Sequence, residues 1–294
     1  MKPPMPRLLL LALLLLLGLP AAAAELKIAA WNIAWLTTKP ASHPDLPDNL
    51  RPRSAADFAR LRAYADRLAA DVVALQEVDG PLAAARVFDS TRYEFHFPAE
   101  TDTQRAGFAW RRGLEVTRNP DVSALDLAPN ARRSLRRGAD ITVRAAGGPP
   151  LRLLSVHLDG GCAWGSVREP NSRDCQNLGR QAEILRDWIA ARRREGIAFA
   201  ILGDFNRQIG RDDEFLAVLT EAAPLTSPTE GFRNPCFARD GRRRRFIDHI
   251  LLGGPARDWL VRDSFRVLLY AERDPALRDR ISDHCPISVR LDPR

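Results

Sequence analysis

Short apolar runs rich in β-branched and aromatic residues recur along this chain and outnumber its helical segments. Such runs are typical of buried strands. Several follow one another through turns too short for the helical crossover that parallel neighbours require. We therefore expect an α+β fold, a sandwich of mixed or antiparallel sheets. The predicted strands are 26–36, 71–78, 92–97, 107–112, 139–145, 151–158, 199–206 and 287–291.

Two segments have the apolar spacing of amphipathic helices. The first begins near Ser54, whose capping-box pattern with Asp57 marks a helix start. The second is expected over residues 177–194, where basic residues fill the last turn and a glycine follows. A two-residue hairpin turn is predicted at Asp240-Gly241.

The N-terminal segment, residues 1–24, has the layout of a secretory signal peptide. A basic start precedes an apolar run from Leu8 to Leu19, and small residues follow it. This run is shorter than the roughly 20 residues of a membrane span, which disfavours an uncleaved anchor. We expect cleavage after Ala24, export to the periplasm or the medium, and no membrane span in the mature protein. Residues 25–294 contain no linker or repeat and are expected to form one domain.

An exported chain usually pairs its cysteines, and this one has Cys162, Cys175, Cys236 and Cys285. They lack C-x-x-C spacing, so a zinc site is disfavoured. Pairing Cys162 with Cys175 would close a short local loop and leave Cys236 for Cys285. This connectivity is a hypothesis among the three that four cysteines permit.

The chain is basic, with a formal net charge of +7, and loss of Lys2 and Arg7 with the leader leaves +5. A basic balance suits a polyanionic partner such as nucleic acid. Nearly all the cations are arginine and alanine is abundant, as a GC-rich genome would also produce. The charge therefore supports a nucleic-acid partner without establishing one.

Polar residues stand where several of the apolar strands end. Buried carboxylates and imidazoles are costly unless they are paired or bind a metal, and scaffolds often present function at such ends. Each residue alone reads better as a satisfied core or capping group, but their recurrence favours a shared site. Carboxylate and amide oxygens suit Mg²⁺, Mn²⁺ or Ca²⁺ better than zinc. The residues are Asn32, Glu77, His157, Asp204, Asn206, Asp248, Asp283 and His284.

Asp204 and Asn206 lie two residues apart in the stretch GDFN, at the end of the strand predicted over 199–206. Side chains two apart on a strand face the same way. We therefore expect this carboxylate and this amide to face one phosphate together. Magnesium held by few carboxylates keeps open positions for phosphate oxygens, and the expected chemistry is attack on phosphorus.

Taken in order, a set of motifs resembles those of the endonuclease/exonuclease/phosphatase superfamily. They are WNIAWL, LQEV, SVHL, GDFN, IDHIL and SDHCP, and they run from Trp31 to Ile287. The resemblance implies a four-layer sandwich, in which two mixed sheets pack face to face with helices outside. It also implies a phosphoric ester hydrolase that depends on Mg²⁺ or Mn²⁺, with Ca²⁺ as a further candidate.

The resemblance assigns a metal site and a nucleophile-activating group to matching positions of this sequence. Glu77 and Asn32 would hold the divalent cation, with Asp283 as an additional ligand. Asp204 would orient and activate the attacking water, and Asn206 would steady the phosphate.

The same resemblance gives two histidines catalytic roles. His284, oriented by Asp248, would donate to the phosphoryl oxygen as charge builds on it. His157 would contact the substrate phosphate and stabilise the transition state or protonate the leaving oxygen, since an unperturbed imidazole titrates near 6.5. Abasic-site endonucleases resemble one another in having tyrosine at the position of His157, so that branch is disfavoured. His249, where an aromatic residue is common, is interpreted as a neighbour on the other face of its strand.

Several arginines are candidates for phosphate contacts. Arg105 and Arg136-Arg137 precede predicted strands, and a solvated position is the alternative for each. Arg242 to Arg245 precede Asp248, but strand alternation would divide this run between two faces. Trp164, in the loop after His157, would either stack on a base or cover a disulfide.

Three functions remain open from the sequence. The leading hypothesis is an exported, monomeric, metal-dependent nuclease, most simply an endonuclease, that hydrolyses DNA or RNA. The second is the same machinery acting on another phosphate, as a phosphatase or a sphingomyelinase-like phospholipase C. The third is a binding module with a silenced site, which the intact residue set disfavours.

Overall fold

The computed structural model describes residues 24–131, 134–236, 245–278 and 280–293. The predicted signal peptide up to residue 23 lies outside these residues, as do the hairpin turn expected at Asp240-Gly241 and Arg242 to Arg244. In the described part of the chain, no helix combines the length and the apolar content of a membrane span.

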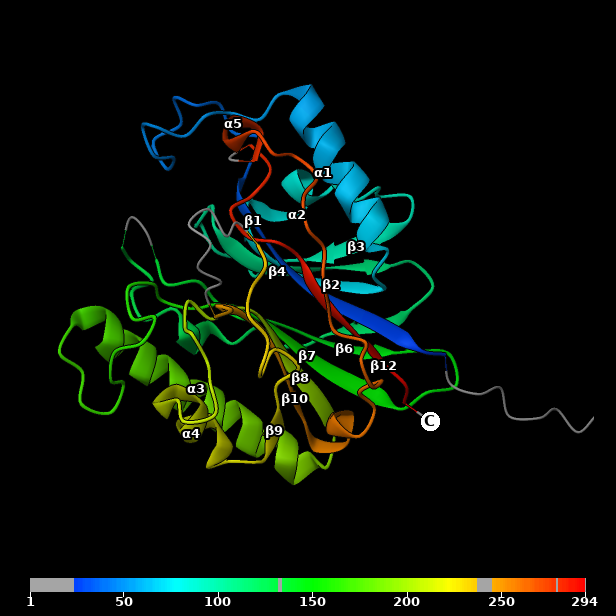
Figure 1. Ribbon diagram of the computed structural model, residues 1–294, viewed down its shortest axis with the longest axis vertical. Coiled ribbons are helices and arrows are strands. Elements are labelled where there is room, and N and C mark those ends of the chain that lie inside the picture. The colour runs from blue at the N-terminus through cyan, green and yellow to red at the C-terminus, as the bar shows by residue number, and fades with distance from the viewer. Residues whose placement is uncertain (1–23, 132–133, 237–244, 279, 294) are drawn as a thin grey trace, which may run out of the picture.

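Two mixed six-stranded sheets pack face to face (Figure 1). In each sheet one central pair is parallel, β1 with β2 and β7 with β8, and the other pairs are antiparallel. The first sheet has the order β11 (Arg266–Val267), β12 (Ile287–Leu291), β1 (Leu26–Leu36), β2 (Val72–Val78), β4 (Arg105–Arg111), β3 (Tyr93–His96). The second has the order β5 (Glu115–Arg118), β6 (Ala139–Arg144), β7 (Pro150–His157), β8 (Ala198–Asp204), β10 (Asp248–Gly253), β9 (Leu225–Thr226).

Helices cover the outer faces of the two sheets. Figure 1 shows α1 (Ala55–Leu68) and α2 (Gly80–Ala84) above the first sheet, and α3 (Arg173–Glu195) and α4 (Glu214–Thr220) below the second. The short elements are η1 (Ser123–Leu125), η2 (Gly254–Arg257) and α5 (Pro275–Arg278). The predicted four-layer sandwich is confirmed.

Side-chain alternation along the strands divides the apolar residues among three cores. Inward-facing residues of both sheets, such as Ile28 and Leu202, form the central core between the sheets. Their neighbours pack outward, Trp31 against α1 and Ile201 against α3. At one end of the strands, the inward-facing positions are occupied by the polar residues predicted to be functional.

The start of each long helix follows from its capping residue. Ser54 and Asp57 form the predicted capping box at the start of α1. The second helix begins at Arg173, earlier than the predicted Asn177, because the Ser172 hydroxyl accepts a hydrogen bond from the Cys175 amide. The predicted strand 199–206 ends at Asp204 instead of reaching Asn206.

Both predicted disulfides are present. Cys162 bonds to Cys175 and Cys236 to Cys285, and among the described residues no cysteine is free. The first holds the loop after β7 against the first turn of α3, and the second ties the end of the 227–236 segment to the residue after His284. Two structural disulfides indicate an oxidising environment.

Candidate active site

Three adjacent strands of the second sheet place polar residues in one row at their ends. His157 on β7 pairs with Asp204 on β8, and Asp204 pairs with Asp248 on β10. All three side chains are buried and follow inward-facing apolar residues of their strands. The register of three neighbouring strands thus gathers an imidazole and two carboxylates that are far apart in sequence.

The first sheet supplies Asn32 and Glu77 to the same place. Asn32 faces inward on β1, and a register shift follows it in the pairing of β1 with β2. Glu77 has a left-handed backbone, with φ of 58°, next to the inward-facing Gln76. This conformation breaks the strand alternation, which would otherwise turn Glu77 away, and such strain is a recurrent feature of functional sites.

Asn32 joins the two carboxylates that lie on opposite sheets. Its amide nitrogen donates to Glu77 Oε1 and to Asp204 Oδ2, each at 3.0 Å, while its oxygen accepts from the Ala34 amide at 2.9 Å. The second Glu77 oxygen accepts from the Trp35 amide at 3.1 Å. Asn32, predicted to be a metal ligand, here holds two acidic side chains together.

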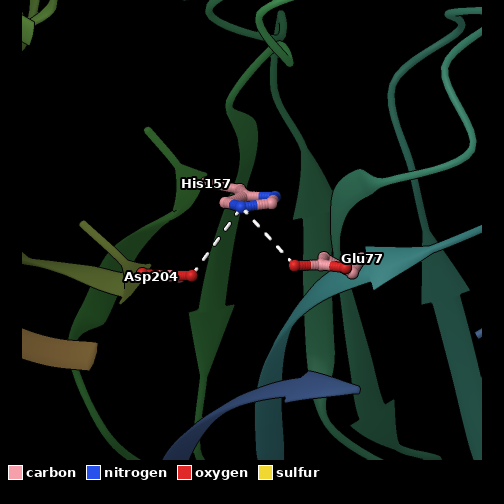
Figure 2. A group of neighbouring side chains, drawn as sticks. All are labelled: Glu77, His157 and Asp204. Atoms are coloured by element: carbon pink, nitrogen blue, oxygen red, sulfur yellow. Dashed lines mark ion pairs between the residues drawn. The ribbon is translucent and has the colours of Figure 1, made fainter. Parts of the chain in front are cut away.

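His157 lies between Glu77 and Asp204, as Figure 2 shows. Its Nε2 is 3.9 Å from Glu77 Oε1 and 3.7 Å from Asp204 Oδ2. Burial, assisted by the charge of Arg136, holds the pKa of His157 well below its ordinary value. The expectation that this imidazole can carry a proton at neutral pH started from an unperturbed pKa, whereas burial and Arg136 here oppose protonation and the Gln104 carbonyl only partly offsets them.

The pKa of His284 is shifted in the opposite direction. Its Nδ1 contacts both oxygens of Asp248 at 2.9 and 3.0 Å, and its Nε2 lies 3.8 Å from Asp204 Oδ2. Burial by itself would lower the pKa of His284, but the Asp248 and Asp204 carboxylates outweigh it and raise the pKa well above the ordinary value. The contacts of Nδ1 with Asp248 thus orient the His284 ring, and the two carboxylates favour its protonated form.

Asp204 is an unusually weak acid for a carboxylic side chain. Burial raises its pKa to about 7, opposed by His284 and the Asn206 amide and assisted by Asp248 and Glu77. The side chain is 1% exposed. A carboxyl group with a pKa in this range can both hold and release a proton near neutral pH.

Asp204 and Asn206 lie together, but not by strand alternation. The strand ends at Asp204, and Asn206 has a left-handed backbone with φ of 51°. Its amide N–H donates to Asp204 Oδ1 at 2.8 Å, an i to i+2 turn typical of aspartate. The Asn206 side chain donates to the Leu158 carbonyl at 3.0 Å, so it links β7 with the turn after β8.

Asp283 and Arg105 lie apart from the carboxylate–histidine groups. Asp283 is exposed, and its charge contributes to the raised pKa of His284. Arg105 donates to the Asp102 carbonyl at 2.8 Å and lies 3.8 Å from an Asp79 oxygen.

Arg136 is closer to the site than the other arginines predicted from sequence. It donates to the Leu158 carbonyl at 2.9 Å, and its Nε is buried with no hydrogen-bond partner among the described residues. Arg137 instead donates to the Ala99 carbonyl at 3.2 Å. Arg245 is exposed beside Gly210.

His249 lies on the outer face of its strand, as interpreted from sequence. Its Nδ1 contacts the Thr229 hydroxyl at 2.8 Å, and its Nε2 contacts the Arg207 carbonyl at 2.9 Å. Burial lowers the pKa of His249, so it is a neutral core group with both nitrogens in hydrogen bonds.

Arg53 supports the site and was not predicted. Its guanidinium donates to the Ile33, Ala34 and Trp35 carbonyls at 2.7 to 3.0 Å. It also reaches the Ile281 carbonyl, next to the SDHCP motif, at 2.8 Å. Since Ala34 and Trp35 have positive φ, Arg53 stabilises the strained bend whose amides hold Asn32 and Glu77. No local pattern distinguishes this arginine from the many others in the chain.

The donor set fits a hard divalent cation. Ligand atoms of Glu77, His157 and Asp204 lie within 4.8 Å of one another, and so do those of Asp204, Asp248 and His284. In the second group the His284 imidazolium already neutralises a carboxylate. In the first group Glu77 and Asp204 flank His157, whose protonation is opposed by burial, and a divalent cation would supply the counter-charge. Carboxylate oxygens with an open side favour Mg²⁺ or Mn²⁺ over zinc.

Sequence comparison identifies the family. A sequence model described as the Endonuclease/Exonuclease/phosphatase family matches residues 29–284. The chain belongs to the endonuclease/exonuclease/phosphatase family. Members of this family are phosphoric ester hydrolases and are often metal-dependent. Every site residue described above lies inside the matched range. A search of curated proteins found no sequence match.

Solved structures of this family share the fold. A humanized D. rerio TDP2 with 14 mutations is 18% identical, with a TM-score of 0.60 over 91% of this chain and 98% of that chain. D. rerio TDP2 complexed with single-strand DNA product is 17% identical, with a TM-score of 0.58 over 91% and 98%. The endonuclease/exonuclease/phosphatase from Bacteroides vulgatus is 14% identical, with a TM-score of 0.56 over 92% and 100%. Likeness at these identities concerns the fold alone.

Proposed function

We propose that this chain is an exported, monomeric, divalent-metal-dependent phosphodiesterase that hydrolyses DNA or RNA as an endonuclease. The observation that carries the proposal is a single convergence. Asp204, Asp248 and His284 meet Glu77 and Asn32 where strands of the two sheets end.

In this proposal Asp204 accepts a proton of the attacking water as the water oxygen bonds to phosphorus. The P–O bond on the opposite side breaks, and the leaving oxygen takes a proton from solvent. A pKa of about 7 matches a general base at neutral pH. The protonated His284 lies beside it, with Nε2 on the side away from Asp248, and donates to the phosphoryl oxygen as negative charge grows. When bound at Glu77, a divalent cation would neutralise charge on the phosphate oxygens.

The remaining groups position the phosphate. Asn206 and Arg136 both donate to the Leu158 carbonyl, so their side chains meet at one point on the rim of the site. The guanidinium of Arg136, which donates to the Leu158 carbonyl, has the charge and the geometry that suit a phosphate oxygen. His157, being neutral, contributes a hydrogen bond without charge.

Two observations favour nucleic acid as the substrate. The full chain has a net charge of +7, or +5 without the leader, which suits a polyanion. One structural neighbour, D. rerio TDP2, carries a single-strand DNA product. Export is supported by the disulfides and by the leader-like residues 1–24, with residues 25–294 acting as one catalytic domain.

The proposal is tested by incubating the purified mature protein with plasmid DNA, RNA, sphingomyelin and inositol phosphates in parallel. We expect cleavage of nucleic acid, internal nicking of the plasmid, loss of activity with EDTA, and recovery with Mg²⁺ or Mn²⁺. Asp204→Asn should lower kcat by about 10³-fold, while the exposed Asp187→Asn should not. Cleavage of sphingomyelin or inositol phosphates alone would contradict the nuclease assignment, and activity in EDTA would contradict the metal.

A further inference from the structure

A loop of fixed conformation follows β7 and borders the candidate site. It spans residues 159–172 and ends at the start of α3 (Figure 1). Cys162 in the loop is bonded to Cys175. The buried Arg207 donates to the Cys162 carbonyl at 3.0 Å, and Glu214 accepts from Ser166 at 2.7 Å and from the Val167 amide at 3.0 Å. These contacts hold the loop from both ends.

Trp164 stands on this loop with its side chain 78% exposed. At this exposure Trp164 does not cover the disulfide, and the backbone of Gly165 packs on it instead. A Cβ added at Gly165 would lie 2.6 Å from Cys175 Sγ and 3.3 Å from Cys162 Sγ, so its backbone packs directly on the two sulfurs. An indole exposed to this extent contributes little buried surface to the core.

The loop is joined to the site through the turn after β8. The Gln208 amide donates to the Ala163 carbonyl at 2.9 Å, next to Trp164 in the chain. Two residues before Gln208, the Asn206 side chain donates to the Leu158 carbonyl, where Arg136 also donates. The loop segment that carries Trp164 is therefore hydrogen-bonded to the turn that carries Asn206.

We propose that Trp164 is a stacking surface for an unpaired nucleobase that flanks the cleaved phosphodiester. This inference rests on the proposed nuclease function and adds a preference for single strands. Only an unpaired base offers its face to an aromatic side chain, since the bases of a duplex are already stacked. A rigid loop presents the indole without further loss of conformational entropy on binding.

A lipid surface is the competing partner for an exposed tryptophan. Insertion into a membrane interface uses a continuous apolar face. The other large hydrophobic side chains exposed in the described part of the chain are Leu82, Phe232 and Leu269, none of which belongs to the 159–172 loop. An isolated indole beside polar and charged residues fits a base better than a bilayer.

The experiment measures binding separately from turnover, in the Asp204→Asn background with Mg²⁺. Fluorescence anisotropy gives the Kd of labelled decathymidylate and of a duplex of equal length, and sedimentation gives binding to sphingomyelin–phosphatidylcholine vesicles. Trp164→Ala should raise the Kd for the single strand about tenfold and leave the duplex unchanged, with Trp164→Phe in between. Leu82→Ala, equally exposed at 79%, is the matched control and should change neither Kd.

An unchanged single-strand Kd in Trp164→Ala, or an equal loss for the duplex, would overturn the stacking role. Loss of vesicle binding with intact single-strand binding would overturn it in favour of a membrane contact. Failure of the nuclease proposal is recognised separately, because the unsubstituted protein would then cleave no nucleic acid. A higher Kd for the single strand in Trp164→Ala would still support the stacking role.

Discussion

Asp204 and Asp248 occupy paired positions on the antiparallel strands β8 and β10, and both carboxylates reach the imidazole of His284. Asp248 contacts Nδ1 with both oxygens, whereas Asp204 lies 3.8 Å from Nε2. One acid therefore fixes the ring and its proton, and the other shares the space in which a substrate would bind. The two roles follow from which ring nitrogen each carboxylate faces.

Asp248→Asn should lower kcat by about 10²- to 10⁴-fold on the substrate cleaved by the unsubstituted protein. The amide keeps the shape but removes the charge that stabilises the His284 imidazolium. Steady-state kinetics give kcat, and circular dichroism shows whether the fold persists. Asp187→Asn, on an exposed aspartate, is the control, and an Asp248→Asn enzyme with normal kcat would remove the orienting role.

Arg53→Lys should raise the Mg²⁺ concentration that gives half-maximal activity. An ammonium cannot replace a guanidinium that donates to carbonyls on both the β1 bend and the residues before the SDHCP motif. Loosening the bend releases the amides that hold Asn32 and Glu77, so we expect about a tenfold higher Mg²⁺ concentration for half-maximal activity. Arg51→Lys, on an exposed neighbour, should not shift it. A purely structural role for Arg53 would lower thermal stability and leave the Mg²⁺ dependence unchanged.

Gly203→Ala should destabilise the protein by about 3 kcal/mol or more. Gly203 has φ of 140°, and a Cβ there would lie 2.1 Å from the Val156 carbonyl oxygen on the neighbouring strand. Gly196 also has positive φ, but a Cβ added there would meet nothing within 4 Å, so Gly196→Ala isolates the backbone penalty of about 1 kcal/mol. Urea unfolding measures the free energy of unfolding of the two variants. Equal losses of stability would show that the close contact with β7 adds nothing to the backbone penalty.

Glu100 should make the free energy of unfolding fall as the pH rises. Burial raises the pKa of Glu100 to about 7, with nearby Asp102 adding to the rise and the Arg137 amide opposing it. A carboxyl group whose folded pKa is raised favours the folded state below its unfolded pKa, and this contribution is lost as the pH rises towards and past 7. Glu100→Gln should remove about 1–3 kcal/mol of pH dependence between pH 5 and 8. Denaturant unfolding across this range checks it, with the exposed Glu115→Gln as the control. If the free energy of unfolding depended on pH in the same way in Glu100→Gln and in the unsubstituted protein, the raised pKa of Glu100 would be contradicted.

Local sequence features identified most of the strands and the long helices. Apolar runs such as 151–158 and the capping box at Ser54 carry their own signals, because burial on a strand and capping of a helix depend on nearby residues. The short edge strands β5, β9 and β11 were missed, since few inward-facing residues mark them. The start of α3 was misplaced because its first turn is fixed by Ser172 and a disulfide partner outside the helix.

The sequence by itself determined the chemical inventory of the site: which acids, amides and imidazoles stand at strand ends, and in which order. Only the tertiary structure decided how Glu77 turns inward, which carbonyls Arg53 bridges, and why the pKa of His157 is lowered while that of His284 is raised. The reason is physical. Charge states and bond partners depend on burial and on groups a few ångströms away, and those neighbours come from strands that are distant in the chain.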